Sequence, residues 1–361
     1  MPKNIVIFSD GTGQEGGVKN DTNIYKLFNM IEDRTERQVS FYDRGIGTGF
    51  RKVTGNIGGM GISRNIKQCY RFIFEHYEAG DRIFLFGFSR GAATMRSLSG
   101  FIHHFGILPK SRPELISKAY DIYRSQDPDR RKRLAEEFVI RHPVMWARVH
   151  FLGCFDTVAA LGLPFETLSA ALDFVPGFRH KFHNFTLSKS VTNAYHALAI
   201  DDERLTFHPV LWDPDIQPYQ TMKQVWFCGM HTDVGGGYQE QELSDIPLVW
   251  MTDMAVQQGL HIFHKHKVMI KENADGTMHD SRGTRLTKLY RKKTREWKKD
   301  GRPRNERPVL HESVLQRTIG KNNQVNSIYH PWIKDLPYEV EPWVRYADQT
   351  WCSTKSRAVT S

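Results

Sequence analysis

The first hundred residues alternate between short apolar runs and longer stretches in which apolar positions recur every three or four residues. The apolar runs are rich in Ile, Val and Phe, as expected of buried strands, and they lie at 4–9, 38–42 and 82–87. The stretches with helical periodicity lie at 22–33, 62–77 and 90–101. Strands and helices that alternate in this way form parallel sheets covered on both faces. The pattern predicts an α/β fold with a mostly parallel sheet and helices on both faces.

The alternation becomes irregular after the third predicted helix. The further elements predicted are strands at 148–155 and 224–229, helices at 188–199 and 246–257, and a pair of polar helices within 112–140. A stretch rich in Phe and Leu occupies 161–186 and is either a lid over an acyl-binding site or plain core.

The chain contains no internal repeat and no linker long enough to separate two independent domains. We therefore expect one α/β domain over residues 1–260, with helical insertions at about 105–145 and 161–190. Residues 261–361 are expected to form a C-terminal extension packed on the same domain.

No apolar stretch approaches the eighteen or more residues that a membrane-spanning helix needs. The first residues, Met-Pro-Lys-Asn-Ile-Val, do not make a signal peptide. The four cysteines are far apart and form no Cys-x-x-Cys pair. These features favour the reducing cytoplasm, and secretion by a machine that reads no signal peptide stays open.

The strongest chemical signal is a Gly-x-Ser-x-Gly motif at Gly87–Gly91. An apolar strand leads into it and a helix leads out, which is the context of a nucleophile elbow. Such a turn projects Ser89 above the sheet at the N-terminus of a helix. The backbone N–H of Arg90 is then a natural donor to an oxyanion. Ser89 is the predicted nucleophile.

A serine nucleophile needs a histidine base and a carboxylate that orients the base. In α/β-hydrolases the acid and then the histidine follow the serine along the chain. Asp156 comes directly after the predicted strand at 148–155, and His231 comes directly after the strand at 224–229, beside a glycine-rich loop. Asp233 is the rival acid, although an aspartate in a turn often binds backbone N–H groups instead.

The turn after the first strand, Asp10-Gly11-Thr12-Gly13, has two interpretations. The backbone N–H of Gly11 or Thr12 supplies a second oxyanion donor, or the turn only starts the next segment. A metal-dependent hydrolase that uses Asp10, Asp156, Asp233 and His231 is a further alternative, but it leaves the elbow serine without a role. We therefore expect neither a metal nor an organic cofactor.

Five motifs occur in order along the chain: Phe8–Thr12, Gly45–Gly49, Gly87–Ala92, Cys154–Val158 and Trp226–Tyr238. Together they resemble the bacterial and fungal group of α/β-hydrolase domains whose best-known members are phospholipase effectors of type VI secretion. The resemblance runs from about residue 3 to 260 and weakly, through 308–314, to 337. It implies a Ser-Asp-His triad, which maps onto Ser89, Asp156 and His231. It also implies a lipid or ester substrate.

The net charge is +10, from 50 Lys and Arg against 40 Asp and Glu. Residues 282–307 contain twelve of the basic residues and three acids, so this basic segment accounts for +9 of the total. It is either a solvated insertion or a surface for an anionic membrane or partner. Nucleic acid is not expected as a partner, and the sequence does not indicate an oligomeric state.

The sequence thus predicts a serine hydrolase that cleaves a carboxylic ester, in particular a lipid or phospholipid ester, through an acyl-enzyme. The alternative from another class is a non-catalytic binding module that uses the basic segment on an anionic membrane or nucleic acid.

Overall fold

The structure is a computed structural model. It describes residues 2–11, 17, 20–45, 57–125, 127–158, 186–263, 268–285, 287–297, 306–320 and 328–349. Thr12 and almost all of the predicted aromatic insertion at 161–186 lie outside the described residues.

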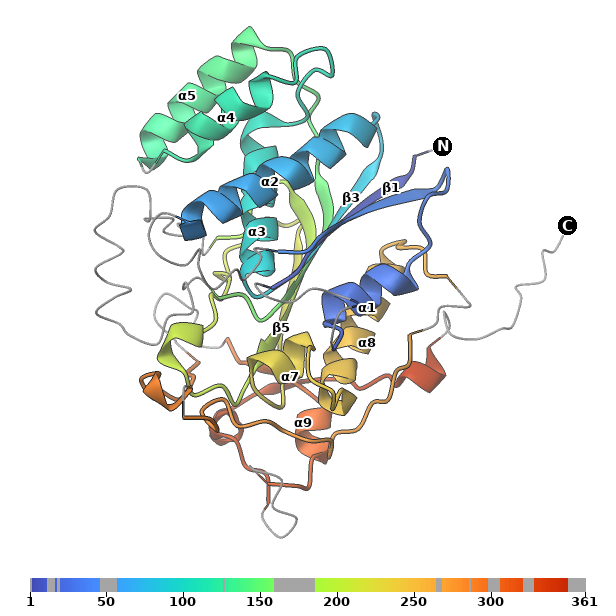
Figure 1. Cartoon of the computed structure of the whole chain (residues 1–361), viewed down its shortest axis with the longest axis vertical. Helices are drawn as coiled ribbons and strands as arrows, with labels where there is room; N and C mark the ends of the chain where they lie inside the picture. The colour runs from blue at the N-terminus through green and yellow to red at the C-terminus, as the bar shows by residue number, and fades with distance from the viewer. Residues whose placement is uncertain are drawn as a thin grey trace, which may run out of the picture.

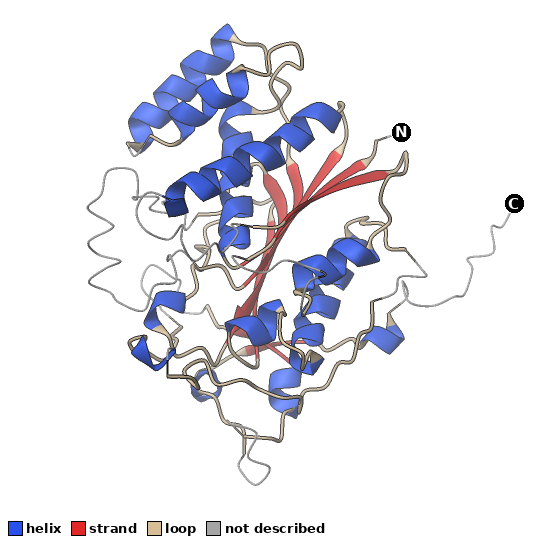
Figure 2. Ribbon diagram, viewed as in Figure 1, coloured by secondary structure: helices blue, strands red, loops and turns tan. Residues whose placement is uncertain are grey.

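The described residues contain an eight-stranded sheet in which every neighbouring pair is parallel (Figures 1 and 2). The strand order is β2-β1-β3-β4-β5-β6-β7-β8. The strands are β1 (Asn4–Ser9), β2 (Gln38–Asp43), β3 (Arg82–Phe88), β4 (Val149–Phe155), β5 (Val191–Ala199), β6 (Thr221–Phe227), β7 (Val309–His311) and β8 (Glu339–Glu341). The predicted α/β fold with a parallel sheet is confirmed.

Helices cover both faces of the sheet, as predicted (Figure 1). One face carries α1 (Asn23–Met30) and α8 (Glu242–Gln257), and the other carries α2 (Ile57–His76) and α3 (Arg90–Phe105). The remaining helices are α4 (Leu115–Tyr123), α5 (Pro128–Arg141), α7 (His231–Gly235) and α9 (Ser313–Gln316), with short 3-10 turns at Leu205–Phe207, Thr287–Leu289, Trp332–Asp335 and Tyr346–Asp348. The polar pair α4 and α5 matches the prediction for 112–140.

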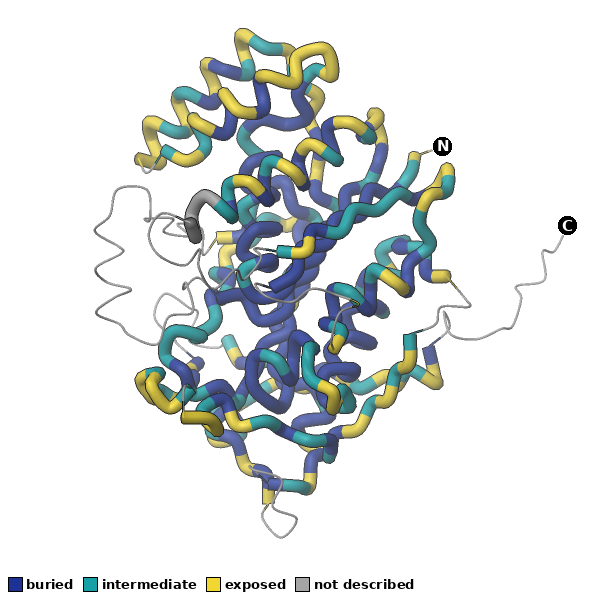
Figure 3. The backbone as a smooth tube through the Cα atoms, in the orientation of Figure 1, coloured by how far each residue is buried: buried dark blue, intermediate teal, exposed yellow. Residues whose placement is uncertain are grey.

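The core consists of two apolar layers, one on each face of the sheet. Val6 and Phe8 of β1 point into the layer beneath α1 and α8, whereas Ile5 and Ile7 point into the layer beneath α2 and α3. Because both faces are covered, the central strands read as continuous apolar runs. Figure 3 shows the buried backbone along these strands.

The helix predicted at 188–199 is wrong, because Val191–Ala199 is strand β5 between β4 and β6. All but one of its nine residues are buried, so the strand lacks the polar–apolar alternation that marks a half-exposed strand. Its three alanines also favour a helix by intrinsic propensity, and sheet packing overrides that preference. His196 is therefore a buried strand residue, not a helix residue.

Two further features of the fold bear on the predictions. The extension after residue 260 adds β7 and β8 to the edge of the sheet beyond β6, and these short strands were not predicted. Within the described ranges, no helix is both long enough and apolar enough to cross a membrane.

Candidate active site

The nucleophile elbow lies between β3 and α3, with Ser89 at its apex. Ser89 has φ 58° and ψ −121°, a conformation that non-glycine residues rarely adopt. A Cβ atom at Gly91 would lie 2.0 Å from the Ser9 carbonyl oxygen of β1, and one at Gly87 would lie 2.5 Å from the Ala92 backbone. Both glycines of the motif are therefore required by close backbone approach, as the elbow interpretation predicts.

The three residues predicted for the triad lie together at the carboxyl edge of the sheet. His231 is the first residue of α7, directly after β6, and Asp156 directly follows β4. The imidazole Nε2 of His231 is 2.8 Å from Ser89 Oγ, and its Nδ1 is 2.6 Å from Asp156 Oδ2. With Asp156 ionised, Nδ1 carries the proton and donates to the carboxylate, which leaves Nε2 to accept the Ser89 hydroxyl proton.

Arg295 is the partner of Asp156 that the sequence interpretation missed. Its guanidinium donates to both carboxylate oxygens, at 2.6 Å to Oδ1 and 2.7 Å to Oδ2. It also donates to the carbonyl oxygens of Ala199 and Phe207, each at 2.6 Å. The Ala199 N–H is a further donor to Asp156 Oδ1, at 3.0 Å. The carboxylate is thus held by a bidentate fork from one side and by the imidazole from the other.

The charges of this buried cluster determine its protonation. Burial alone would raise the pKa of Asp156, but the Arg295 guanidinium and the hydrogen bonds from Arg295 and His231 outweigh it and hold that pKa well below its usual range. Burial lowers the pKa of His231, against the opposing effects of Asp156 and Asp202. His231 is therefore a neutral base at neutral pH, beside an ionised carboxylate.

Aromatic rings hold the imidazole in place. The ring of Phe88, from the elbow itself, lies 4.7 Å from the His231 ring centroid, and the ring of Phe207 lies 5.2 Å away on an edge-to-face contact. A Cβ atom at Gly235 would lie 2.0 Å from the Phe88 ring, so α7 can pack against Phe88 only with glycine at that position. These ring contacts, together with the hydrogen bond to Asp156, fix the orientation of the buried base.

The Asp233 carboxylate pairs with His279 rather than with the His231 ring. Its Oδ1 lies 2.6 Å from His279 Nδ1, and its Oδ2 accepts the backbone N–H groups of Met230 and His279. Asp233 therefore caps the first turn of α7 and ties it to the segment at 279, as the alternative interpretation of this aspartate predicts. His279 is a second residue that sequence reasoning did not single out.

Asp10 lies directly after β1 and has three hydrogen-bond donors. Its carboxylate accepts from the Thr22 hydroxyl at 2.6 Å, from the Tyr42 hydroxyl at 2.7 Å and from the Gly11 N–H at 2.7 Å. Burial raises the pKa of Asp10 to about 6. Because the Gly11 N–H already donates to Asp10, the arrangement does not place it as an oxyanion donor.

The Arg90 N–H lies in the first turn of α3, where helix geometry provides no intrahelical acceptor.

The residues of the metal-site alternative do not converge. Asp156 is engaged by Arg295 and His231, Asp233 by His279, and Asp10 by two hydroxyl groups. In the part of the chain that the structure describes, no group of three or more His, Cys, Asp or Glu side chains is arranged to hold a metal ion.

Residues 291–295 of the basic segment pack along residues 203–208. Lys293 N–H donates to the Glu203 carbonyl oxygen, Leu205 N–H donates to the Arg291 carbonyl oxygen, and Lys292 Nζ lies 3.2 Å from the Glu203 carboxylate. The Arg295 side chain is fully buried, and Trp297 is buried as well. Arg295 and Trp297 are therefore built into the body of the protein, whereas several neighbouring residues, among them Arg285, Lys288 and Lys292, are exposed.

A parallel sheet with a strand–turn–helix elbow, and with serine, histidine and aspartate gathered at its carboxyl edge, defines the α/β-hydrolase class. A model of the family described as "T6SS, Phospholipase effector Tle1-like, catalytic domain" matches residues 3–254. The chain belongs to this family.

Individual relatives are distant. The chain is 27% identical over 319 residues to a Saccharomyces cerevisiae protein named Uncharacterized protein YEL023C, which covers 80% of this chain and 44% of the relative. A crystal structure of an uncharacterized Pseudomonas aeruginosa protein superimposes with a TM-score of 0.44 at 17% identity, covering 76% of this chain and 50% of that one. The Tle1 effector bound to the VgrG spike gives 0.39 at 20% identity, covering 66% and 52%. The chain thus spans about half the length of these relatives.

Proposed function

We propose that the protein is a serine hydrolase of lipid or phospholipid carboxylic esters, with Ser89 as nucleophile, His231 as base and Asp156 as the orienting acid. The observation that carries the proposal is the unbroken hydrogen-bond chain from Ser89 Oγ through His231 to Asp156. Membership in a family of phospholipase effectors supports a lipid ester as the substrate class. A lipid ester as the substrate of this chain is therefore part of the proposal.

In the proposed mechanism, Ser89 Oγ attacks the ester carbonyl carbon while its proton passes to His231 Nε2. The carbonyl oxygen becomes an oxyanion that accepts a hydrogen bond from the Arg90 N–H at the positive end of α3. The tetrahedral intermediate collapses to an acyl-enzyme as His231 gives its proton to the departing alcohol. Water, deprotonated by His231, then releases the carboxylic acid and restores Ser89.

Arg295 acts in this proposal as a positioning residue. Its fork fixes the plane of the Asp156 carboxylate, and the carboxylate in turn fixes the His231 ring and its tautomer. The positive charge also neutralises part of the aspartate charge, so the imidazole stays neutral to lower pH than it would beside an unpaired carboxylate. The basic segment thereby contributes directly to the candidate active site.

Hydrolysis of an ester series, from short nitrophenyl esters to phosphatidylglycerol, tests the proposal. Wild type is expected to hydrolyse esters, Ser89→Ala to lose that activity, and Ser97→Ala, a matched control from the same helix, to keep it. Activity unaffected by Ser89→Ala would contradict the proposal. Loss of activity with a chelator, and not with Ser89→Ala, would favour the metal-dependent alternative.

The non-catalytic alternative is separated by a second readout. A binding module would retain liposome or nucleic-acid binding in Ser89→Ala and show no hydrolysis in wild type, with binding that falls steeply as salt rises. Residence in the cytoplasm and membrane contact through the basic segment stay predictions.

A further inference from the structure

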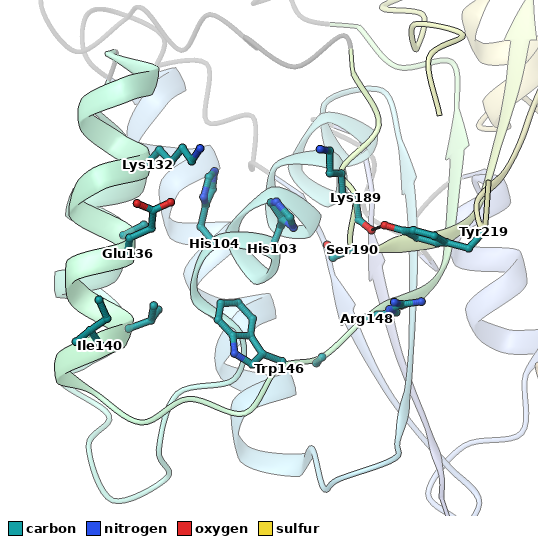
Figure 4. Close-up of a pocket in the computed structure, with 13 residues that line it drawn as sticks. His103, His104, Lys132, Glu136, Ile140, Trp146, Arg148, Lys189, Ser190 and Tyr219 are labelled. Carbon is teal, nitrogen blue, oxygen red and sulfur yellow. Dashed lines mark hydrogen bonds between the residues drawn. The ribbon is translucent and has the colours of Figure 1, made fainter. Parts of the chain in front are cut away.

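A cavity of about 820 Å³ lies at the end of the sheet opposite Ser89 (Figure 4). Ser89 precedes the first turn of α3, whereas His103 and His104 in the last turn of α3 line the cavity. The rise of an α-helix separates these two ends by roughly 20 Å. The other walls come from α5 and from the segments that lead into β4, β5 and β6. The cavity is therefore distinct from the candidate active site.

The polar side chains of the cavity are mainly cationic. Lys132 of α5, Arg148 before β4 and Lys189 before β5 line it, and Glu136 is the acid among its described lining residues. Figure 4 shows Lys132 and Lys189 on opposite walls with His103 and His104 between them. Within the described ranges, none of the three cations forms an ion pair with a carboxylate. The charged lining residues are thus three cations and one carboxylate, an excess of positive charge.

Burial is the main cause of the lowered pKa values of the two histidines. Burial, with Lys189 nearby, lowers the pKa of His103. Burial, with His103 and Arg131 nearby, lowers the pKa of His104 to about 4. Both rings are therefore neutral at pH 7, and they line the cavity as hydrogen-bonding groups between the two lysines. An anion placed there would relieve the repulsion among the cations.

Three large apolar or aromatic side chains of the lining are open to solvent. Trp146 is 63% exposed, Ile140 is 83% exposed and Tyr219 is 45% exposed, although large apolar side chains usually avoid water. The Arg148 guanidinium lies 4.8 Å from the centroid of the Tyr219 ring, which holds that charge at the cavity wall. The cavity thus offers cations and an adjoining apolar wall in one space.

We propose that this cavity binds an anionic amphiphile: a single phosphate or carboxylate headgroup between Lys132 and Lys189, with its alkyl chain against Trp146 and Ile140. The volume lies in the range of small-molecule sites. Charge complementarity selects the headgroup, and the exposed apolar wall selects a chain over a free anion. The proposal does not depend on the proposed catalytic function.

Calorimetry with monomeric dodecyl phosphate tests it, since this probe contains no carboxylic ester and is not a substrate for the proposed reaction. Wild type is expected to bind dodecyl phosphate at least tenfold more tightly than inorganic phosphate or dodecyl maltoside. Lys132→Met with Lys189→Met should weaken binding at least tenfold, as should Trp146→Ala, whereas Lys110→Met at an exposed site should not. NMR titration should show the pKa of His103 and His104 rising when the probe is bound.

Three results would overturn the proposal. Equal affinity for dodecyl maltoside would show that the apolar wall alone binds, and equal affinity for inorganic phosphate would show that the chain makes no contact. Unchanged dodecyl phosphate binding in the double lysine variant, with circular dichroism like that of wild type, would remove the assigned headgroup site.

Discussion

Arg295→Met is the substitution that tests the buried charge cluster most sharply. The arginine is fully buried and makes four hydrogen bonds, two to Asp156 and two to backbone carbonyl oxygens. Methionine fills a similar volume but leaves the Asp156 carboxylate buried with His231 and one backbone N–H as partners. Removing one member of a buried ion pair costs about 3–5 kcal/mol of unfolding free energy. We expect a loss of that size for Arg295→Met.

Lys292→Met provides the matched control from the same segment. Lys292 pairs with Glu203 at 3.2 Å, but its side chain is 59% exposed. Exposed pairs of this kind contribute about 0–1 kcal/mol, so the control should lie within about 1 kcal/mol of wild type. Urea unfolding followed by circular dichroism at pH 7 measures both variants, and equal slopes would show that the unfolding transitions are comparable.

The double variant Asp156→Asn with Arg295→Met completes the test. Because both changes disrupt one interaction, the loss in the double variant should be clearly smaller than the sum of the two single losses. If Arg295→Met were as stable as Lys292→Met, or if the two single losses added, Asp156 and Arg295 would not stabilise the fold as a pair.

The remaining predictions concern the chemistry of the elbow and the triad. Asp156→Asn should reduce kcat by about 10⁴-fold, whereas Asp233→Asn should keep kcat within about tenfold because its carboxylate contacts His279 rather than His231. Activity requires the neutral His231 ring, and the folded-state pKa of His231 is lowered. The pH profile of kcat/KM should therefore fall on the acid side with a midpoint below the ordinary histidine pKa of 6.5. A midpoint at or above 6.5 would contradict this prediction. Gly91→Ala should prevent formation of the elbow, because the alanine Cβ would lie 2.0 Å from the Ser9 carbonyl oxygen. Native-like activity and thermal stability in that variant would count against the described elbow.

The stability of the cluster also has a predicted pH dependence. The folded-state pKa of Asp156 is lowered, so its contribution is fully present above its unfolded value near 3.8 and is lost as the pH falls through the folded-state pKa. Stability measured from pH 7 to pH 2 should therefore fall more steeply below about 4 in wild type than in Arg295→Met.

The sequence predicts those parts of the fold that depend on local patterns. The elbow could be predicted because strand, glycine motif and helix are contiguous at 82–101, and Asp156 and His231 could be placed because each directly follows an apolar run. β5 could not be predicted in the same way, because the buried polar residues Asn193 and His196 and three alanines interrupt the continuous apolar run that marks the other central strands.

Arg295 shows the limit on the functional side. It lies 139 residues from Asp156 in sequence, among eleven other basic residues of 282–307, and nothing local distinguishes it. Trp297, two residues on, was the available signal, because a tryptophan within a charged stretch indicates a buried side. The basic segment that carries most of the net charge is therefore only partly exposed. Its residue that reaches the triad, Arg295, can be recognised only from the fold.

Ser89 is proposed to be an activated nucleophile. Labelling with a fluorophosphonate, followed by mass spectrometry of the digested protein, tests this claim without any choice of substrate. We expect one adduct on Ser89, which is absent in Ser89→Ala and persists in Ser97→Ala. Labelling at another residue, or no labelling of a protein that hydrolyses esters, would contradict it.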